Sequence, residues 1–133
     1  MSFLGDHEGG NLAQLGVKND AAIRRRVLDF DEWDGTVLSA ACLHFASLDR
    51  EAQIDSVLPE RFGKVSTRGL WRVRAPDEIV AMVRGWNFPL FRQSDVLLAA
   101  LKLFLALPEP KCREWLREVF LFVGQEPRPL RIA

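Results

Sequence analysis

The sequence predicts a mainly α-helical domain of about six helices with a short two-stranded antiparallel ribbon. Apolar residues recur at helical spacing in six segments of the chain. One stretch, 71–75, instead alternates between apolar residues and arginine, which is the period of a half-buried strand. The order of segments also repeats, because a strand-like segment followed by three helices occurs twice. This repetition predicts two related halves, 12–60 and 61–124, with a pseudo-twofold relation.

The length and composition are typical of one compact domain. The chain has 133 residues, of which 48% are hydrophobic, enough for a sizeable core. The longest apolar stretch, 96–107, is interrupted by Lys102 and is too short for a membrane span. Residues 1–11 lack a signal-peptide pattern and are expected to form a flexible arm, and 125–133 an extended tail. We therefore expect a cytoplasmic protein with no membrane partner, in which Cys42 and Cys112 are reduced core thiols.

The first half is expected to hold one strand and three helices. Polar capping residues, helical apolar stripes and a proline set the expected boundaries. These are a strand over 14–18, a helix from Asp20 capped by Asn19, a second helix opened by Gly35 and Thr36, and a third over 50–58 stopped by Pro59.

The second half repeats this order. Its first two helices begin where proline or serine precedes an acidic residue, a combination that favours a helix N-terminus. The expected elements are a strand over 71–74, a helix opened by Pro76, Asp77 and Glu78, a central apolar helix over 95–107 capped by Ser94, and a last helix from Pro110 to Gly124.

An alignment without gaps supports the internal repeat. Residues 36–48 match 95–107 at a valine, a leucine, two alanines, a phenylalanine and the final leucine. Two apolar helices rich in alanine and leucine can also match by chance, so the repeat stays a hypothesis at this level. If it is real, one chain supplies both strands of the ribbon.

Residues 72–83, followed by 94–105, resemble the ribbon-helix-helix family of DNA-binding proteins. The shared pattern is a short alternating strand, a helix that starts with proline and two acids, and a second helix opened by serine and an acid. Residues 12–48 share it more weakly. Two features depart from the family: the connection 85–93 is longer than its usual turn, and the first half carries an acidic cluster. The resemblance implies a single-chain tandem, acting as a monomer with an internal pseudo-dimer or as a homodimer.

The resemblance implies that the ribbon enters the major groove of double-stranded DNA. The resulting function is a transcriptional regulator or a DNA-transfer accessory factor. The alternative for the two strand arginines is an ordinary solvated face. The residues implied as base contacts are Arg72 and Arg74, with Lys18 and Gln14 as weaker partners, and those implied as phosphate contacts are Arg68, Lys64 and Ser94.

The charge is divided unevenly along the chain. Lysine plus arginine and aspartate plus glutamate each number 18, so the net charge is zero. Residues 12–60 carry five basic and nine acidic side chains, whereas 61–133 carry thirteen basic and seven acidic. A net charge of zero weakens non-specific attraction to DNA, and the second half has the basic footprint that such binding needs.

Reactive side chains are scarce. The two histidines are His7 in the arm and His44 inside a helix, and there is no tyrosine. Cys42 and His44 are two apart on a helix, so they point to different faces. No zinc, serine-hydrolase or phosphate-loop motif occurs. We therefore expect no catalytic residue, no metal and no cofactor, and interpret the protein as a binding protein rather than an enzyme.

An acidic aromatic segment, 29–34, suggests a second function. Its side chains Asp31, Glu32, Trp33 and Asp34 could bind a basic protein partner, as in inhibitor, immunity or adaptor proteins. Two other interpretations are open. The aromatic residues could pack inward, or the acids could pair with the arginines at 24–26.

Overall fold

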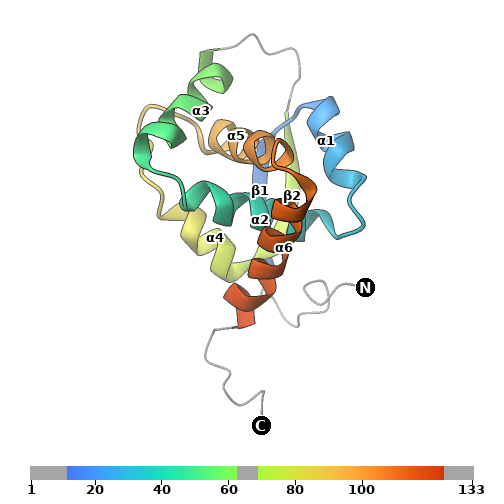
Figure 1. The fold of residues 1–133 in the computed structure, drawn as a ribbon. Helices are drawn as coiled ribbons and strands as arrows, with labels where there is room; N and C mark the ends of the chain where they lie inside the picture. The colour runs from blue at the N-terminus through green and yellow to red at the C-terminus, as the bar shows by residue number, and fades with distance from the viewer. Residues whose placement is uncertain (1–11, 63–68, 125–133) are drawn as a thin grey trace.

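The computed structural model describes residues 12–62 and 69–124. This part of the chain forms six helices and a two-stranded sheet, as the sequence predicts (Figure 1). The elements are β1 (Leu12–Lys18), α1 (Ala21–Leu28), α2 (Asp34–Ala46), α3 (Arg50–Phe62), β2 (Leu70–Pro76), α4 (Asp77–Arg84), α5 (Gln93–Leu105) and α6 (Glu109–Gly124). The order strand, helix, helix, helix therefore occurs twice. The arm 1–11, the tail 125–133 and the phosphate-contact candidates Lys64 and Arg68 lie outside the described residues.

The two strands form an antiparallel ribbon, although more than fifty residues separate them in sequence. Leu15 pairs with Val73, Gln14 with Arg74, and Gly16 with Arg72. Alternation along each strand places one face against the helices, because successive side chains of a strand point to opposite sides. The side chains on this inner face are buried: Leu15, Val17, Trp71, Val73 and Ala75.

Helices α2 and α5 form the centre of the core. They pack against each other, and α2 also packs on β2 while α5 packs on β1 (Figure 1). Helix α6 covers α2, and α3 covers α5. Both central helices are buried nearly all round, and their Phe45 and Phe104 are fully buried. No helix in the described ranges has the length and apolar character needed to cross a membrane.

Several helix boundaries differ from those predicted. Asp20, not Asn19, caps α1, and its carboxylate accepts from the Ala22 and Ile23 amides. Helix α2 begins at Asp34, one residue before the predicted Gly35. Helix α5 begins at Gln93 with Arg92 at the N-cap position, so Ser94 lies inside the first turn and is not the cap.

Pro59 does not end α3, which continues to Phe62. A proline inside a helix removes one backbone hydrogen bond, here the bond to the Asp55 carbonyl four residues earlier. Pro59 and Asp55 are both exposed, so water can satisfy that carbonyl. The helix is therefore interrupted at one bond rather than terminated.

Thr36→Val is expected to raise the free energy of unfolding by up to about 1 kcal/mol. Thr36 is fully buried at the start of α2, and its hydroxyl oxygen has no hydrogen-bond partner among the described residues. Valine keeps the shape and removes the unsatisfied polar atom. Urea unfolding measures the change. Ser39→Ala is the matched control, because the buried Ser39 hydroxyl donates to the Gly35 carbonyl at 2.6 Å. A larger loss from Thr36→Val than from Ser39→Ala would contradict this reasoning.

Candidate nucleic-acid interface

The outer face of the ribbon carries the two strand arginines predicted as base contacts. Arg72 and Arg74 are both exposed on β2, and Gln14 is exposed opposite Arg74 on β1. Neither arginine side chain makes an ion pair or hydrogen bond with the described part of the chain. The backbone beneath them is held firmly, since the inner residues next to them in the strand, Trp71 and Val73, are buried. Two guanidinium groups therefore project from a rigid base.

On the β1 side the outer face is shallow. Gly16 has no side chain, and the side chain of Leu70 lies over it. A Cβ atom added to Gly16 would lie 2.8 Å from the Leu70 Cδ1 atom. Leu70 itself is 47% exposed. The outer face thus presents two arginines from β2 and one glutamine from β1. Toward the end of the ribbon it presents the apolar side chain of Leu70, which lies over Gly16.

Lys18, predicted as a further base contact, is held by the protein itself. Its Nζ lies 3.2 Å from the Asp95 carboxylate and also donates to the Glu60 carbonyl. Asp95 is buried in the first turn of α5, where the helix dipole also favours its negative charge. The Lys18 ammonium therefore ties the end of β1 to α5. The sequence shows a cation at an outward position but not its partner, which lies far along the chain.

A hollow of about 410 Å³ lies where the ribbon end meets the N-terminus of α5. Ser94, predicted as a phosphate contact, is one of its lining residues. Three cations also line it, and one of them, Arg61, donates to the Leu90 carbonyl at 3.4 Å. The full lining is Lys18, Arg61, Gly69, Leu70, Arg92, Ser94 and Asp95. Sequence reasoning missed Arg61 and Arg92 because they lie on other elements and meet the ribbon only in the fold.

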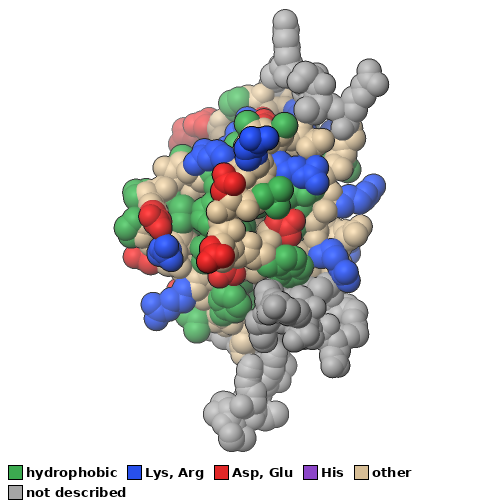
Figure 2. Space-filling model, turned by 90° about the vertical axis from the view of Figure 1, so that its right-hand side faces the viewer, with side chains coloured by type: hydrophobic (Ala, Val, Ile, Leu, Met, Phe, Trp, Pro, Cys, Tyr) green, Lys and Arg blue, Asp and Glu red, His purple; other side chains and the backbone are tan. Residues whose placement is uncertain are grey.

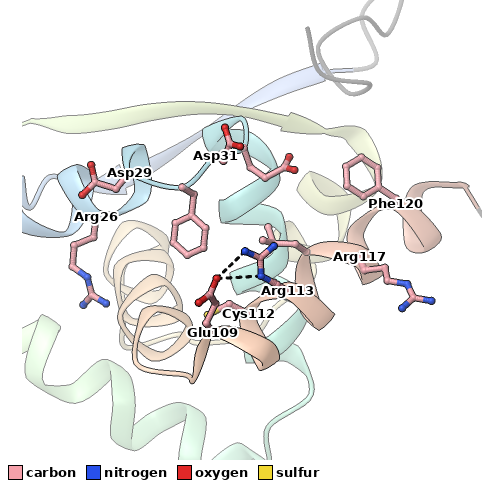
Figure 3. A pocket seen from close by; sticks show the side chains of 11 residues that line it. Arg26, Asp29, Asp31, Glu109, Cys112, Arg113, Arg117 and Phe120 are labelled. Atoms are coloured by element: carbon pink, nitrogen blue, oxygen red, sulfur yellow. Dashed lines mark hydrogen bonds and ion pairs between the residues drawn. The ribbon is translucent and has the colours of Figure 1, made fainter.

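Residues 29–32 of the acidic segment line a groove of about 760 Å³ against α6 (Figure 3). Asp29, Asp31 and Glu32 stand on one side, and arginines of α6 on the other. Figure 3 shows Arg113 bonded to Glu109 on its own helix and Arg117 pointing away from that pair. No ion pair within the described ranges joins the acids to the arginines at 24–26; Arg26 instead donates to the Leu105 carbonyl at 2.8 Å.

The aromatic residues of this segment pack inward. The Phe30 ring lies 5.9 Å from the buried Phe104 ring. Trp33 is partly buried, packs against the core and occupies the N-cap position of α2, and Asp34 follows it in the first helical turn. The exposed aromatic anchor that the second hypothesis placed at Trp33 is therefore a core contact, and the acids remain as the accessible part.

Charges are mixed on the face that lies at the right-hand side of Figure 1. Figure 2 shows lysine and arginine side chains along the upper and right-hand edges of this face and also at its left, where they lie beside acidic side chains, with further acidic side chains in its middle. Hydrophobic side chains lie between them. The described residues on this face therefore form no continuous band of one sign.

The remaining candidate groups are buried or partly buried. Cys42 and Cys112 are buried free thiols, as expected, and burial raises the pKa of both. His44 packs beside Trp115, with ring centroids 5.6 Å apart, and burial lowers its pKa. In the described ranges no group of three histidine, cysteine, aspartate or glutamate side chains is placed to hold a metal ion.

No protein-family model, curated protein or solved structure matches this chain.

Proposed function

We propose that this protein binds double-stranded DNA through the outer face of the β1–β2 ribbon. One observation carries the proposal. The inner face of the ribbon is buried in the core, while its outer face presents Arg72 and Arg74, exposed and without an ion pair in the described part of the chain. Neither of these two guanidinium groups is therefore committed to an ion pair within the described part of the chain.

The dimensions and chemistry of the ribbon suit the major groove. The groove of B-form DNA admits a two-stranded antiparallel ribbon, whose outward side chains then face the base edges. The planar guanidinium of arginine can donate two hydrogen bonds to O6 and N7 of guanine, and a glutamine amide can bond adenine in a similar way. Arg72, Arg74 and Gln14 are the side chains proposed for these contacts.

The internal organisation supports a single-chain arrangement of the ribbon-helix-helix kind. Each strand has seven residues, and their middle residues, Leu15 and Val73, pair with each other. The first helices have eight residues each, and the second helices thirteen each. The contacts between the halves also come in matching pairs. Helix α2 packs on β2 as α5 packs on β1, and α6 packs on α2 as α3 packs on α5. We infer a pseudo-twofold axis through the middle of the ribbon, and a monomer as the binding unit.

Phosphate contacts are proposed at the hollow beside the α5 N-terminus. Backbone N–H groups at a helix start favour an anion, and Arg92 and Ser94 lie at this start. Lys18 is left out of the proposed contact set, because its ammonium already neutralises Asp95. A transcriptional regulator or an accessory factor of DNA transfer would use such a surface.

Replacing Arg72 and Arg74 with alanine is expected to weaken DNA binding by about tenfold for each arginine, since one bidentate contact is worth about 1–3 kcal/mol. Fluorescence anisotropy with a labelled mixed-sequence duplex, at two salt concentrations, measures the affinity. The wild-type affinity should fall with salt, and more steeply than that of the double variant.

Arg84→Ala is the matched control for this experiment. Arg84 is an exposed arginine in the last turn of α4, and makes no ion pair in the described ranges. Its loss should leave the affinity within about twofold, which is the size of a small surface-charge effect. If the wild-type protein does not bind at low salt, or if Arg84→Ala weakens binding as much as the double variant, DNA binding through the ribbon is wrong.

Binding of a basic protein partner through Asp31 and Glu32 is the second candidate. It is favoured by the groove of about 760 Å³ that these acids line with Phe120 and the α6 arginines. The two candidates depend on different side chains. Asp31→Asn with Glu32→Gln should abolish capture of such a partner and leave DNA binding intact.

A further inference from the structure

We propose that this chain recognises an asymmetric, non-palindromic DNA site, with guanines read from the β2 side and a different base read by Gln14 on the β1 side. This inference rests on the proposed DNA-binding function and specifies its ligand. It follows from two observations. The register shows which residues of β1 and β2 occupy equivalent positions, and the side chains at those positions differ.

The register identifies the equivalent positions. Because Leu15 and Val73 pair at the middle of the two strands, a twofold axis through this pair would exchange the residues around them. The residue before each middle position is Gln14 in β1 and Arg72 in β2, and the residue after it is Gly16 in β1 and Arg74 in β2. All of these lie on the outer face.

The two strands present different chemistry at these positions. β2 offers two guanidinium groups, whereas β1 offers one neutral amide and a glycine covered by Leu70. The only cation in β1 is Lys18, and its ammonium is bound to Asp95 at 3.2 Å. The positive charge of the ribbon therefore lies on one strand alone.

The two ends of the ribbon also differ. At the end beside α5, Arg61 and Arg92 line the hollow together with the Lys18–Asp95 pair, whose charges balance each other. At the other end the start of α2 lies against the backbone of Arg74, and Trp33 occupies the N-cap position that Arg92 has in α5. Each first turn holds one acid, but Asp95 of α5 is paired with Lys18, whereas Asp34 of α2 has no ion pair in the described ranges. Phosphate is attracted to the first end and not to the second, so both base and backbone contacts are unequal across the axis.

A ribbon made of two identical chains offers the same side chains on both sides of its axis, which suits an inverted repeat. The ribbon of this chain offers arginine on one side, which favours guanine, and glutamine on the other, which favours adenine. The geometry therefore points to a duplex whose two halves differ in sequence.

Selection from a pool of duplexes with a randomised central segment, followed by sequencing of the bound fraction, tests the inference. The wild-type protein should enrich a motif that is not its own inverted repeat, with guanine on one side. Arg72→Ala or Arg74→Ala should each reduce the guanine preference about tenfold at one position. The control Arg84→Ala should enrich the wild-type motif.

A gain-of-symmetry variant makes the test sharper. Gln14→Arg with Gly16→Arg places arginine at both positions of β1, and should convert the enriched motif into an inverted repeat with guanine on both sides. Position 16 can accept the larger residue because the atom nearest to a new Cβ is the far end of the flexible Leu70 side chain. Gln14→Arg alone is the second variant if the double variant does not fold, and should add guanine at one position of the β1 side.

The outcomes separate this inference from the proposed function. An inverted-repeat motif for the wild-type protein, or binding with no enriched motif, would overturn the asymmetric reading and leave DNA binding in place. An unchanged motif for folded arginine-added variants would also overturn it. Failure of the wild-type protein to retain any duplex would instead overturn the proposed function.

Discussion

Replacement of Gly35 with alanine is expected to lower the free energy of unfolding by about 3 kcal/mol or more. A Cβ atom at this position would lie 2.2 Å from the Arg74 carbonyl oxygen and 2.9 Å from two ring atoms of Trp33. The carbonyl belongs to the backbone of β2, so it cannot turn aside as a side chain can. Helix α2 would have to move away from the ribbon, and overpacking of a core contact costs about 1–3 kcal/mol even where side chains can adjust.

Urea unfolding followed by circular dichroism measures this effect, and Gly85→Ala is the matched control. Gly85 has a φ of −85° at the end of α4, and the nearest atoms to an added Cβ lie 3.5 Å away or more. Alanine is compatible with this backbone and should be neutral or stabilise by about 0.4–1 kcal/mol through the unfolded state. Equal effects of the two substitutions would show that the contact between α2 and β2 is not as close as described.

Lys18→Met is expected to destabilise the protein by about 3 kcal/mol, because it leaves the Asp95 carboxylate buried without its cation. The side chain of Asp95 is 6% exposed and that of Lys18 is 17% exposed. Removing one partner of a buried pair is costly, whereas replacing both with apolar residues is often neutral. The double variant Lys18→Met with Asp95→Leu should therefore recover stability to within about 1 kcal/mol of the wild-type protein. Urea unfolding of the three proteins measures this coupling.

The same pair of variants separates the structural role of Lys18 from a role in DNA contact. The double variant keeps Arg72 and Arg74, so its DNA affinity should stay within about threefold of wild type, the change expected for loss of a charge that touches no phosphate. An exposed pair on α6, Arg113 and Glu109 at 2.8 Å, is the control for stability. Arg113→Ala should cost no more than about 0.5 kcal/mol. A similarly small cost for Lys18→Met would contradict the interpretation of a buried anchor.

The ribbon and its outward arginines follow largely from the sequence. Alternation at 71–75 places Trp71 and Val73 inside and Arg72 and Arg74 outside, because the side chains of a strand point to opposite faces in turn. The apolar character of α5 likewise predicts its central position, since a helix without a polar face is stable only when it is surrounded. These properties are local and periodic, so they can be predicted from the amino-acid sequence alone.

The partners of side chains depend on the tertiary structure. Lys18 has the outward position of a DNA contact, yet its ammonium pairs with Asp95, whose place beside the ribbon is set by the packing of α5 on β1. Gly35 looks like an ordinary residue at a helix start, and only the approach of α2 to β2 makes its missing side chain necessary.

The sequence by itself therefore determined the helical class, the ribbon and the outward arginines. The tertiary structure decided which charges are neutralised internally, which aromatic residues are buried, and where a side chain has no room. The physical reason is that periodicity records the face on which a residue lies, whereas pairing and close contact depend on elements that meet only after the chain has folded.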